Sequence, residues 1–328
     1  MPDKGTILVG TVGQGVFRST NDGETWGRAG PSQGMHSDAV VRCLRTDPAR
    51  PEVVFAGTDL GLYRSRDGGG SWKSIDSPLS HQTVWALAID GHDAKFMMAG
   101  TGTPSRPRLF RSENAGDSWT ESKAEIAEEC AAVGVPRPTA IAIDPENPRS
   151  VWAGLEVDGV RHSKDGGQTW ERAAVQIQNP DVHNLVVTGG PAKRVVVLVN
   201  DDVWLSEDDG TNWRAVGARQ VFPWHYPRGV AVRPDDSNVI FVTIGDTTPG
   251  RTGAVMRSCD AGQTWEDLTL PGQPNSAMWT LTIADSTPDL MFAASRYGYL
   301  YRSEDGGDSW VRLWREFSEV SSLAWLPA

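Results

Sequence analysis

One eight-residue pattern recurs seven times along the 328 residues of this chain, and it constrains the fold more than any other feature. The pattern reads Ser, any residue, Asp or Asn, any residue, Gly, any residue, a residue that is usually Ser or Thr, and Trp. Its copies span residues 19–26, 65–72, 112–119, 163–170, 206–213, 258–265 and 303–310. Self-similarity at a period of roughly 40 to 50 residues is typical of repeat architectures, in which the units bury their apolar faces only against one another.

Each copy of this box lies between two strand-like runs, as at 61–65 and 72–75, and therefore predicts a hairpin turn. The Ser and Asp or Asn side chains can accept hydrogen bonds from turn amides, and the Gly supplies a positive φ. The Trp begins the next strand and is expected to bury its ring between neighbouring sheets. The residues between boxes fit four short antiparallel strands, which is one blade of a propeller.

The first box has only two strands before it, and the inner-strand pattern that it lacks occurs at 319–326. We therefore predict an all-β fold, a single seven-bladed β-propeller over residues 1–328 with four-stranded antiparallel blades. Its C-terminal strand should pair with the three N-terminal strands and close the ring. The blades are predicted at 319–328 plus 5–30, 38–76, 82–122, 137–174, 182–216, 227–269 and 277–313. A capping box at 122–125 and apolar residues at helical spacing predict a short helical insertion at 123–133.

With its seven boxes the chain resembles the BNR or Asp-box repeat propellers. That group includes sialidases, sortilin-type receptor domains, xyloglucan hydrolases and the photosystem II assembly factor. The resemblance implies that the boxes lie on the face away from the ligand. A true sialidase is not expected, because the Phe or Tyr-Arg-Ile-Pro motif is absent and those enzymes have six blades. Xyloglucan hydrolases use two tandem seven-bladed domains, of which this chain has the length of one, whereas the assembly factor matches in blade count and size.

Charge and cysteine content narrow the possible partners. A formal net charge of -11 and a pI near 5.0 argue against nucleic acid and against an anionic membrane surface. The sequence has no apolar signal core and no run of 18 apolar residues, so no membrane partner and a cytoplasmic location are expected. Its three cysteines, Cys43, Cys130 and Cys259, form no CxxC motif, which fits a reducing compartment.

Function is expected on the face formed by the segments leading into the inner strands and by the loops joining second to third strands. Alignment of the inner strands places one residue per blade at the mouth of the axial channel: Arg42, Trp85, Thr139, His183, Arg228, Trp279 and Ser321. Two cations, an imidazole and two indoles suit a ligand with an anionic group and a planar or sugar-like face. The same long side chains could instead plug the channel, and both interpretations stay open.

Four of the six histidines, His36, His81, His183 and His225, lie in or at the end of the segments leading into inner strands. His183, with His81 or His225, is predicted to move protons in catalysis. Substrate binding is predicted for Arg42, Arg228, Trp85, Trp279, His36, Trp224 and Tyr226. The four histidines are also the candidates for a divalent metal, although none has HxH or HExxH spacing, so no cofactor is assigned.

Two functions from different classes follow. The first is a propeller enzyme of hydrolase or lyase type that acts on a small anionic or glycosidic substrate, such as a carbohydrate, at the mouth. The second is a non-catalytic scaffold that binds a ligand or protein partner through the same face, with residues 222–226 as an exposed aromatic anchor. The enzyme is favoured here, because four histidines near the mouth are more reactive groups than a docking surface needs.

Overall fold

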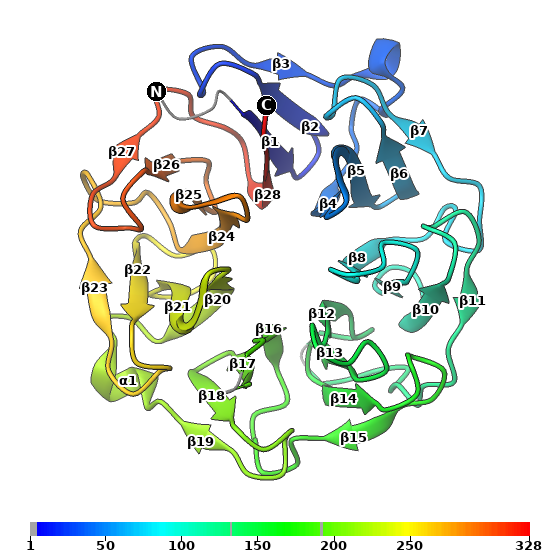
Figure 1. Ribbon diagram of the computed structural model, residues 1–328, viewed down its shortest axis with the longest axis vertical. Helices are drawn as coiled ribbons and strands as arrows, with labels where there is room; N and C mark the ends of the chain where they lie inside the picture. The colour runs from blue at the N-terminus through cyan, green and yellow to red at the C-terminus, as the bar shows by residue number, and fades with distance from the viewer. Residues whose placement is uncertain (1–4, 132, 191–192) are drawn as a thin grey trace.

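The computed structural model describes residues 5–131, 133–190 and 193–328, and these form seven four-stranded antiparallel sheets around one axis (Figure 1). The predicted seven-bladed propeller is confirmed. The inner strand of each sheet lies next to the axis, and the fourth, outer strand lies at the rim (Figure 1). We number the blades from the one that contains the N-terminal strand.

Blade 1 contains β28 (Val320–Leu326), β1 (Thr6–Thr11), β2 (Val16–Ser19) and β3 (Gly27–Arg28). Blade 2 contains β4 (Val41–Asp47), β5 (Arg50–Thr58), β6 (Gly61–Ser65) and β7 (Lys73–Ser74). Blade 3 contains β8 (Val84–Ile89), β9 (Met97–Thr101), β10 (Arg108–Ser112) and β11 (Thr120–Glu121). Blade 4 contains β12 (Pro138–Ile143), β13 (Val151–Leu155), β14 (Gly159–Ser163) and β15 (Glu171–Ala173).

Blade 5 contains β16 (Val182–Val187), β17 (Val195–Val199), β18 (Asp202–Ser206) and β19 (Arg214–Ala215). Blade 6 contains β20 (Tyr226–Arg233), β21 (Asp236–Gly245), β22 (Gly253–Ser258) and β23 (Glu266–Leu268). Blade 7 contains β24 (Met278–Ala284), β25 (Thr287–Ser295), β26 (Leu300–Ser303) and β27 (Val311–Arg312). A 3-10 helix, η1 (Pro31–Gln33), and one helical turn, α1 (Ala218–Val221), lie in links between blades. No described helix is long and apolar enough to cross a membrane.

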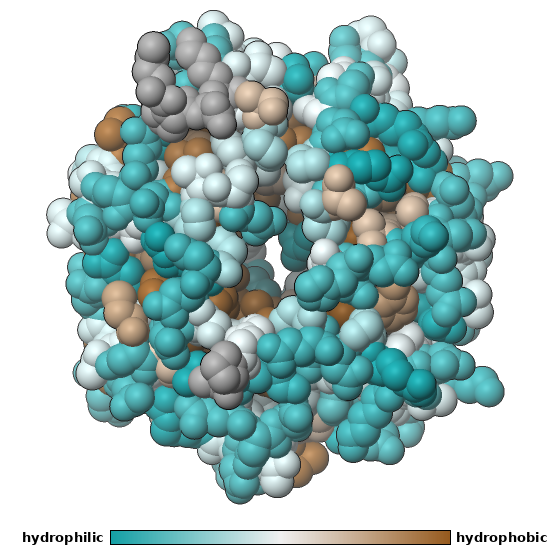
Figure 2. Space-filling model, in the orientation of Figure 1, coloured by the Kyte–Doolittle hydropathy of each residue, from teal (hydrophilic) through white to brown (hydrophobic). Residues whose placement is uncertain are grey.

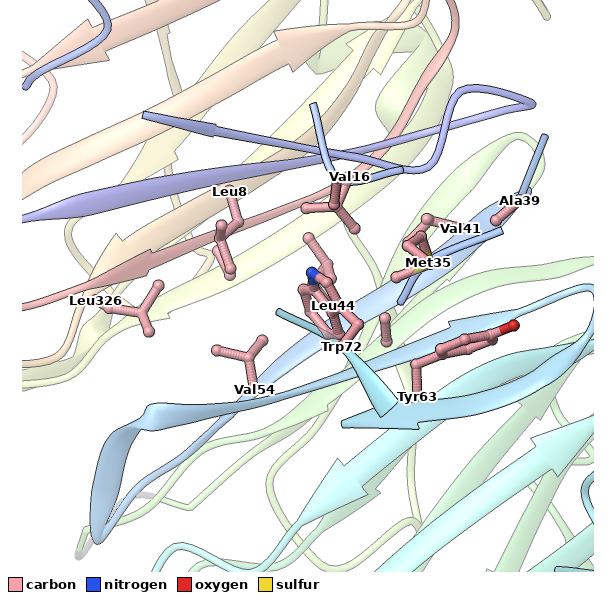
Figure 3. Close-up of a cluster of buried hydrophobic side chains, with 13 residues drawn as sticks. Leu8, Val16, Met35, Ala39, Val41, Leu44, Val54, Tyr63, Trp72 and Leu326 are labelled. Carbon is pink, nitrogen blue, oxygen red and sulfur yellow. The ribbon is translucent and has the colours of Figure 1, made fainter. Parts of the chain in front are cut away.

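Blade 1 is built from both ends of the chain. β28 pairs with β1 in antiparallel register from Thr6 opposite Leu326 to Thr11 opposite Val320. Ring closure by the C-terminal strand is therefore confirmed. Figure 3 shows the result at the junction with blade 2, where Leu326 and its neighbour Leu8 face Val54 of β5 within one buried apolar cluster.

The second strand of each blade explains why the chain needs no separate hydrophobic core. In β9, β13 and β17 every residue is buried, because a neighbouring blade covers each face of the sheet. Their sequences, MMAGT, VWAGL and VVVLV, are accordingly apolar or small on both faces instead of alternating with polar residues. The hydrophobic core is therefore divided into clusters that lie between adjacent blades, and each blade contributes one layer of side chains to a cluster.

All seven boxes form the same turn. In the second box the Ser65 hydroxyl accepts a hydrogen bond of 2.8 Å from the Gly69 amide, and Oδ1 of Asp67 accepts one of 2.8 Å from the Ser71 amide. The Ser-to-Gly bond recurs in every box. The glycine has a φ between +77° and +98° in every copy, which a residue with a Cβ rarely adopts. The recurring polar residues are thus accounted for by the turn itself.

The predicted helix at 123–133 is wrong for the described residues of this segment, and residue 132 lies outside them. No residue described in this segment is helical, and its backbone bonds to blade 4: the Lys123 amide donates to the Gln168 carbonyl, and the Ala127 amide donates to the Asp158 carboxylate. The Glu125 carbonyl accepts from the Arg161 guanidinium. These groups would bond to one another in a helix, so the packing against blade 4 outweighs the helical pattern.

Candidate functional site at the channel mouth

Every inner strand has a β-bulge near its start, and the extra residue of each bulge is the residue that the sequence placed at the mouth. In blade 6, Pro227 pairs with Ile244 and Gly229 pairs with Thr243, so Arg228 between them has no partner. The same break leaves unpaired Arg42, Trp85, Thr139, His183, Trp279 and Ser321. Bulges commonly re-aim a side chain. Here all seven side chains line one cavity at the mouth of the channel.

The cavity has a volume of about 300 Å³, at the lower end of the range for small-molecule sites. Its lining is completed by Arg137, Glu156, Asn184, Tyr226, Thr248, Thr280 and Arg296. A second cavity of about 460 Å³ continues between the inner strands and shares Arg42, Trp85 and Thr139 with the first. Figure 2 shows the opening at the centre of the ring. The channel is therefore open at the mouth and is not plugged by these side chains.

Three of the seven bulge residues connect neighbouring blades. Oγ1 of Thr139 donates to the Val182 carbonyl at 2.7 Å, and Nδ1 of His183 lies 2.7 Å from the Pro227 carbonyl, to which it donates. The Ser321 hydroxyl donates in the same way to the carbonyl of Val41. Each of these carbonyls belongs to the residue directly before the next blade's bulge. The three side chains therefore hold successive bulges in register around the ring.

The side chain of His183 is almost fully enclosed. Its side chain is 2% exposed, and its ring centroid lies 4.7 Å from that of Tyr226. Burial lowers its pKa below the ordinary value, and the nearby Arg228 cation lowers it further. The ring is therefore neutral at pH 7, with its proton on Nδ1 and with Nε2 at 3.7 Å from Oδ2 of Asp181.

The other four bulge residues form two arginine–tryptophan clusters. In the first cluster, defined as Arg42, Trp85 and Arg137, the guanidinium carbons lie 4.0 and 4.8 Å from the indole centroid. In the second cluster, defined as Arg228, Trp279 and Arg296, they lie 3.8 and 4.5 Å from it. Cation–π contact of this kind orients a guanidinium without neutralising it. The indoles, predicted to stack on the substrate, here stack on arginines.

The four arginines differ in their carboxylate partners. Arg137 pairs with Glu156, and Arg296 pairs with Glu319 at 2.5 Å. Among the described residues, neither Arg42 nor Arg228 forms an ion pair, and Nε of Arg42 lacks a hydrogen-bond partner. Burial, followed by repulsion from Arg296 and Arg137, lowers the pKa of Arg42 to about 10. Both unpaired guanidiniums remain charged at pH 7, so the mouth is cationic in a protein whose net charge is -11.

The remaining predicted histidines are elsewhere. His36 and His81 are exposed, and neither they nor His225 line the cavity that contains His183. The structure therefore does not bring the four imidazoles together in this cavity. In the part of the chain that the structure describes, no group of three or more His, Cys, Asp or Glu residues could hold a metal ion.

The aromatic loop at 222–226 divides its side chains between three environments. Phe222 is buried, with its ring centroid 5.3 Å from that of Trp265. Trp224 is 37% exposed, and Tyr226 lines the cavity. Trp224 is therefore the exposed side chain of the predicted aromatic anchor, and Phe222 does not contribute to it.

Two cavity arginines were missed by the sequence argument. Arg137 precedes the bulge of blade 4 by two residues, and Arg296 follows β25 directly. Both lie in the two classes of loop that we expected to carry function. Their own positions could not be aligned between blades because these loops differ in length. A search for arginines within a few residues of the aligned mouth positions would have found Arg137.

Comparison with known proteins gives distant relatives. No protein-family model matches the sequence. The chain is 25% identical over 319 residues to a xyloglucanase of Hypocrea jecorina, a match that covers 81% of this chain and 38% of the relative. It is 25% identical over 325 residues to xyloglucanase Xgh74A of Acetivibrio thermocellus, covering 80% of this chain and 38% of that one. The chain thus spans about two-fifths of the length of these relatives.

Solved structures resemble this chain in fold. YCF48 bound to D1 peptide superposes with a TM-score of 0.61 at 18% identity, and the match covers 93% of each chain. A putative 6-phosphogluconolactonase from Bacteroides fragilis superposes with a TM-score of 0.62 at 12% identity, covering 99% of this chain and 98% of that one. At these identities the likeness shows the propeller fold alone.

Proposed function

We propose that this propeller binds a small anionic ligand of carbohydrate type in the cavity at the mouth of its channel. The observation that carries the proposal is that Arg42 and Arg228 point into one cavity without a carboxylate partner among the described residues. Guanidinium groups bind carboxylates and phosphates through paired, charge-assisted hydrogen bonds. An anion between them would also relieve the repulsion among the four arginines.

The carbohydrate part of the proposal rests on two further observations. The curated relatives that match four-fifths of this chain are xyloglucanases by name, so their substrates are polysaccharides. The cavity lining also includes Asn184, Thr248 and Thr280, whose amide and hydroxyl groups suit the hydroxyls of a sugar. A sugar acid combines both kinds of group in one ligand.

A second candidate function is hydrolysis of an anionic glycoside, and the match to xyloglucanases is the observation that favours it. Glycoside hydrolysis needs one group that protonates the leaving oxygen and another that activates water or attacks the sugar. The described cavity lining offers Glu156, His183 and Tyr226 for these roles. Of these, Glu156 has the better access, because its side chain is 12% exposed and that of His183 is 2% exposed.

Ligand binding is tested by calorimetric titration with glucuronate, galacturonate and inorganic phosphate, and with glucose as the neutral reference. We expect an anion to bind and glucose not to bind. The double variant Arg42→Ala with Arg228→Ala should abolish binding, whereas Arg66→Ala, an exposed arginine of the second box, should not change it. Equal binding of glucuronate by the double variant would refute the assignment.

Hydrolysis is tested by release of 4-nitrophenol from its glucuronide and its glucoside. We expect turnover of the glucuronide and its loss in Glu156→Gln. For His183→Asn we expect a changed melting temperature and retained turnover, because His183 ties blades 5 and 6 together. Loss of turnover with an unchanged melting temperature in His183→Asn would instead restore the catalytic role predicted from sequence.

The scaffold alternative has one supporting observation, the partly exposed Trp224 beside the cavity residue Tyr226. A protein partner that docks there should lose affinity in Trp224→Ala, because exposed aromatic side chains often dominate interfaces. Small-anion binding that survives Trp224→Ala would separate this surface from the cavity.

A further inference from the structure

We propose that the ligand carries two anionic groups, one held by each arginine–tryptophan cluster, and so spans the mouth of the channel. This inference rests on the proposed function and narrows its ligand class to a small dianion, such as a sugar with a carboxylate at each end. It follows from the internal correspondence of the two clusters.

The two clusters are built from the same parts. In each, a bulge arginine stacks on the indole of the next blade's bulge: Arg42 of blade 2 on Trp85 of blade 3, and Arg228 of blade 6 on Trp279 of blade 7. In each, a loop contributes a second arginine to the same indole. The construction is repeated at two separate places on the ring, so the mouth has two similar cationic sites.

Each cluster retains one uncompensated charge. The loop arginines are ion-paired, Arg137 with Glu156 and Arg296 with Glu319. The bulge arginines Arg42 and Arg228 form no ion pair among the described residues. A monoanion bound to one of them would leave the other guanidinium partly buried and unpaired, which is costly. A ligand with two anionic groups satisfies both.

The two clusters lie at different places on the ring but line the same cavity, so one ligand that spans the mouth can contact both. Their bulge residues belong to blades 2 and 3 and to blades 6 and 7, so blades 4 and 5 separate these residues on one side and blade 1 on the other (Figure 1). All six cluster residues nevertheless line the same cavity of about 300 Å³. Burial and then repulsion across the cavity, from Arg228, lower the pKa of Arg137. Asn184 and Thr280 also line this cavity and suit a hydroxylated ligand backbone.

The test uses three probes with one six-carbon skeleton: glucose, glucuronate and glucarate, which carry zero, one and two carboxylates. Hexanoate and adipate form a second pair without hydroxyls. Titration at fixed ionic strength should give glucarate an affinity at least about tenfold above that of glucuronate, since one more charge-assisted contact is formed. Arg42→Gln and Arg228→Gln should each reduce glucarate to about the affinity of glucuronate, and Arg66→Ala should change neither.

The outcomes separate this inference from the proposed function. Equal affinities within both ligand pairs would overturn the dianion and leave anion binding intact. No binding by any anionic probe would overturn both. Circular dichroism and melting curves check that the variants fold. The comparison of probes on the unaltered protein tests the preference for a dianion without any variant.

Discussion

The two ends of each blade differ in how closely their residues repeat: the box end keeps the same residues from blade to blade, and the mouth end varies them. At the box end, the turn between the third and fourth strands keeps the same Ser, Gly and Trp in all seven blades and makes the same Ser-to-Gly hydrogen bond each time. At the mouth end, the seven bulges share their geometry, but their residues belong to five types: Arg, Trp, Thr, His and Ser. Each box forms the turn of its own blade, whereas the seven bulge residues together line one cavity.

The difference predicts that changes at the box end alter stability and leave ligand binding intact, while changes at the mouth do the reverse. Three bulge residues are exceptions in part, because Thr139, His183 and Ser321 also tie adjacent blades together. Arg296 of the second arginine–tryptophan cluster also donates to a backbone carbonyl of the next blade, that of Val320 at 3.3 Å, so the first cluster is the better place to test the contrast.

The largest effect should come from deleting residues 319–328, which removes β28. Full burial of Val320, Leu323 and Leu326 is worth roughly 5–9 kcal/mol, comparable to the whole stability of a typical protein. We expect loss of cooperative thermal unfolding, measured by calorimetry. A truncated protein that melts like the full chain would show that ring closure does not hold the structure together.

The next largest effect is expected from Gly210→Ala in the fifth box. Gly210 has a φ of +81°, and a Cβ there would lie 2.5 Å from the Trp152 ring of the neighbouring blade. Strain and overpacking should lower the free energy of unfolding by about 2–4 kcal/mol. Gly13→Ala is the control, because Gly13 has a φ of +84° with open space around it and tests the backbone cost alone. Denaturant titration should rank them in that order, with ligand affinity unchanged by Gly210→Ala.

At the mouth, Trp279→Leu should weaken anion binding by about tenfold, since a cation–π contact that orients Arg228 and Arg296 is worth ~0.5–2 kcal/mol. Trp85→Leu should act similarly through Arg42 and Arg137. Titration measures the affinity, and melting curves should change little. A fall in stability as large as that of Gly210→Ala would make the indoles structural residues.

A smaller effect of opposite sign is expected from Arg42→Gln. This change removes a partly buried cation that has no ion pair and is repelled by Arg296 and Arg137. The ligand-free protein should be unchanged or more stable, by no more than ~1 kcal/mol. Denaturant titration without ligand measures this, and clear destabilisation would indicate that Arg42 supports the fold.

Near neutral pH, neither the stability contributed by the boxes nor anion binding at the mouth should depend on pH. The first should be lost in acid and the second in alkali. Partial burial opposes ionisation of Asp165 in the fourth box, but hydrogen bonds from Thr169 outweigh it and lower its pKa to about 2. Its contribution to stability is present above its ordinary pKa of 3.8 and is lost as the pH falls toward 2. The pKa of Arg42 is about 10, so anion binding should weaken as the pH rises through 10.

This pH contrast is measured by melting curves from pH 2 to 7 and by titrations from pH 6 to 10.5. Asp165→Asn should reduce the loss of stability in acid without changing affinity for the anion at pH 7. Binding that is lost between pH 6 and 8 would point to a histidine in the site and would contradict the assignment to arginines.

Much of the fold could be read from the sequence because each blade repeats a short-range signal. Box spacing gave the blade count, and the unmatched strand pattern at 319–326 located the ring closure. Alignment of the inner strands even placed Arg42 beside Trp85 in the ring of mouth residues. Short-range reasoning was wrong at 123–133, where the helical pattern was genuine but blade 4 offered the backbone better partners.

The candidate site was predicted only in part. Its seven bulge positions follow from the repeat, but the loop arginines Arg137 and Arg296 lie in segments of variable length that no alignment relates to the axis. Proximity of His36, His81 and His225 to the mouth in sequence did not place them in the cavity. Loop direction, which the sequence leaves free, decides which of these side chains reach it.

By itself the sequence determined that seven turns of one kind recur and that the chain ends must share a blade, since hydrogen-bonding and burial patterns are local to each repeat. The tertiary structure decided how the cations at the mouth are paired. Ion pairing depends on distances between blades, and these exist only once the ring has closed. Glu156 and Glu319 thus compensate two arginines, while Arg42 and Arg228 have no ion pair within the described ranges.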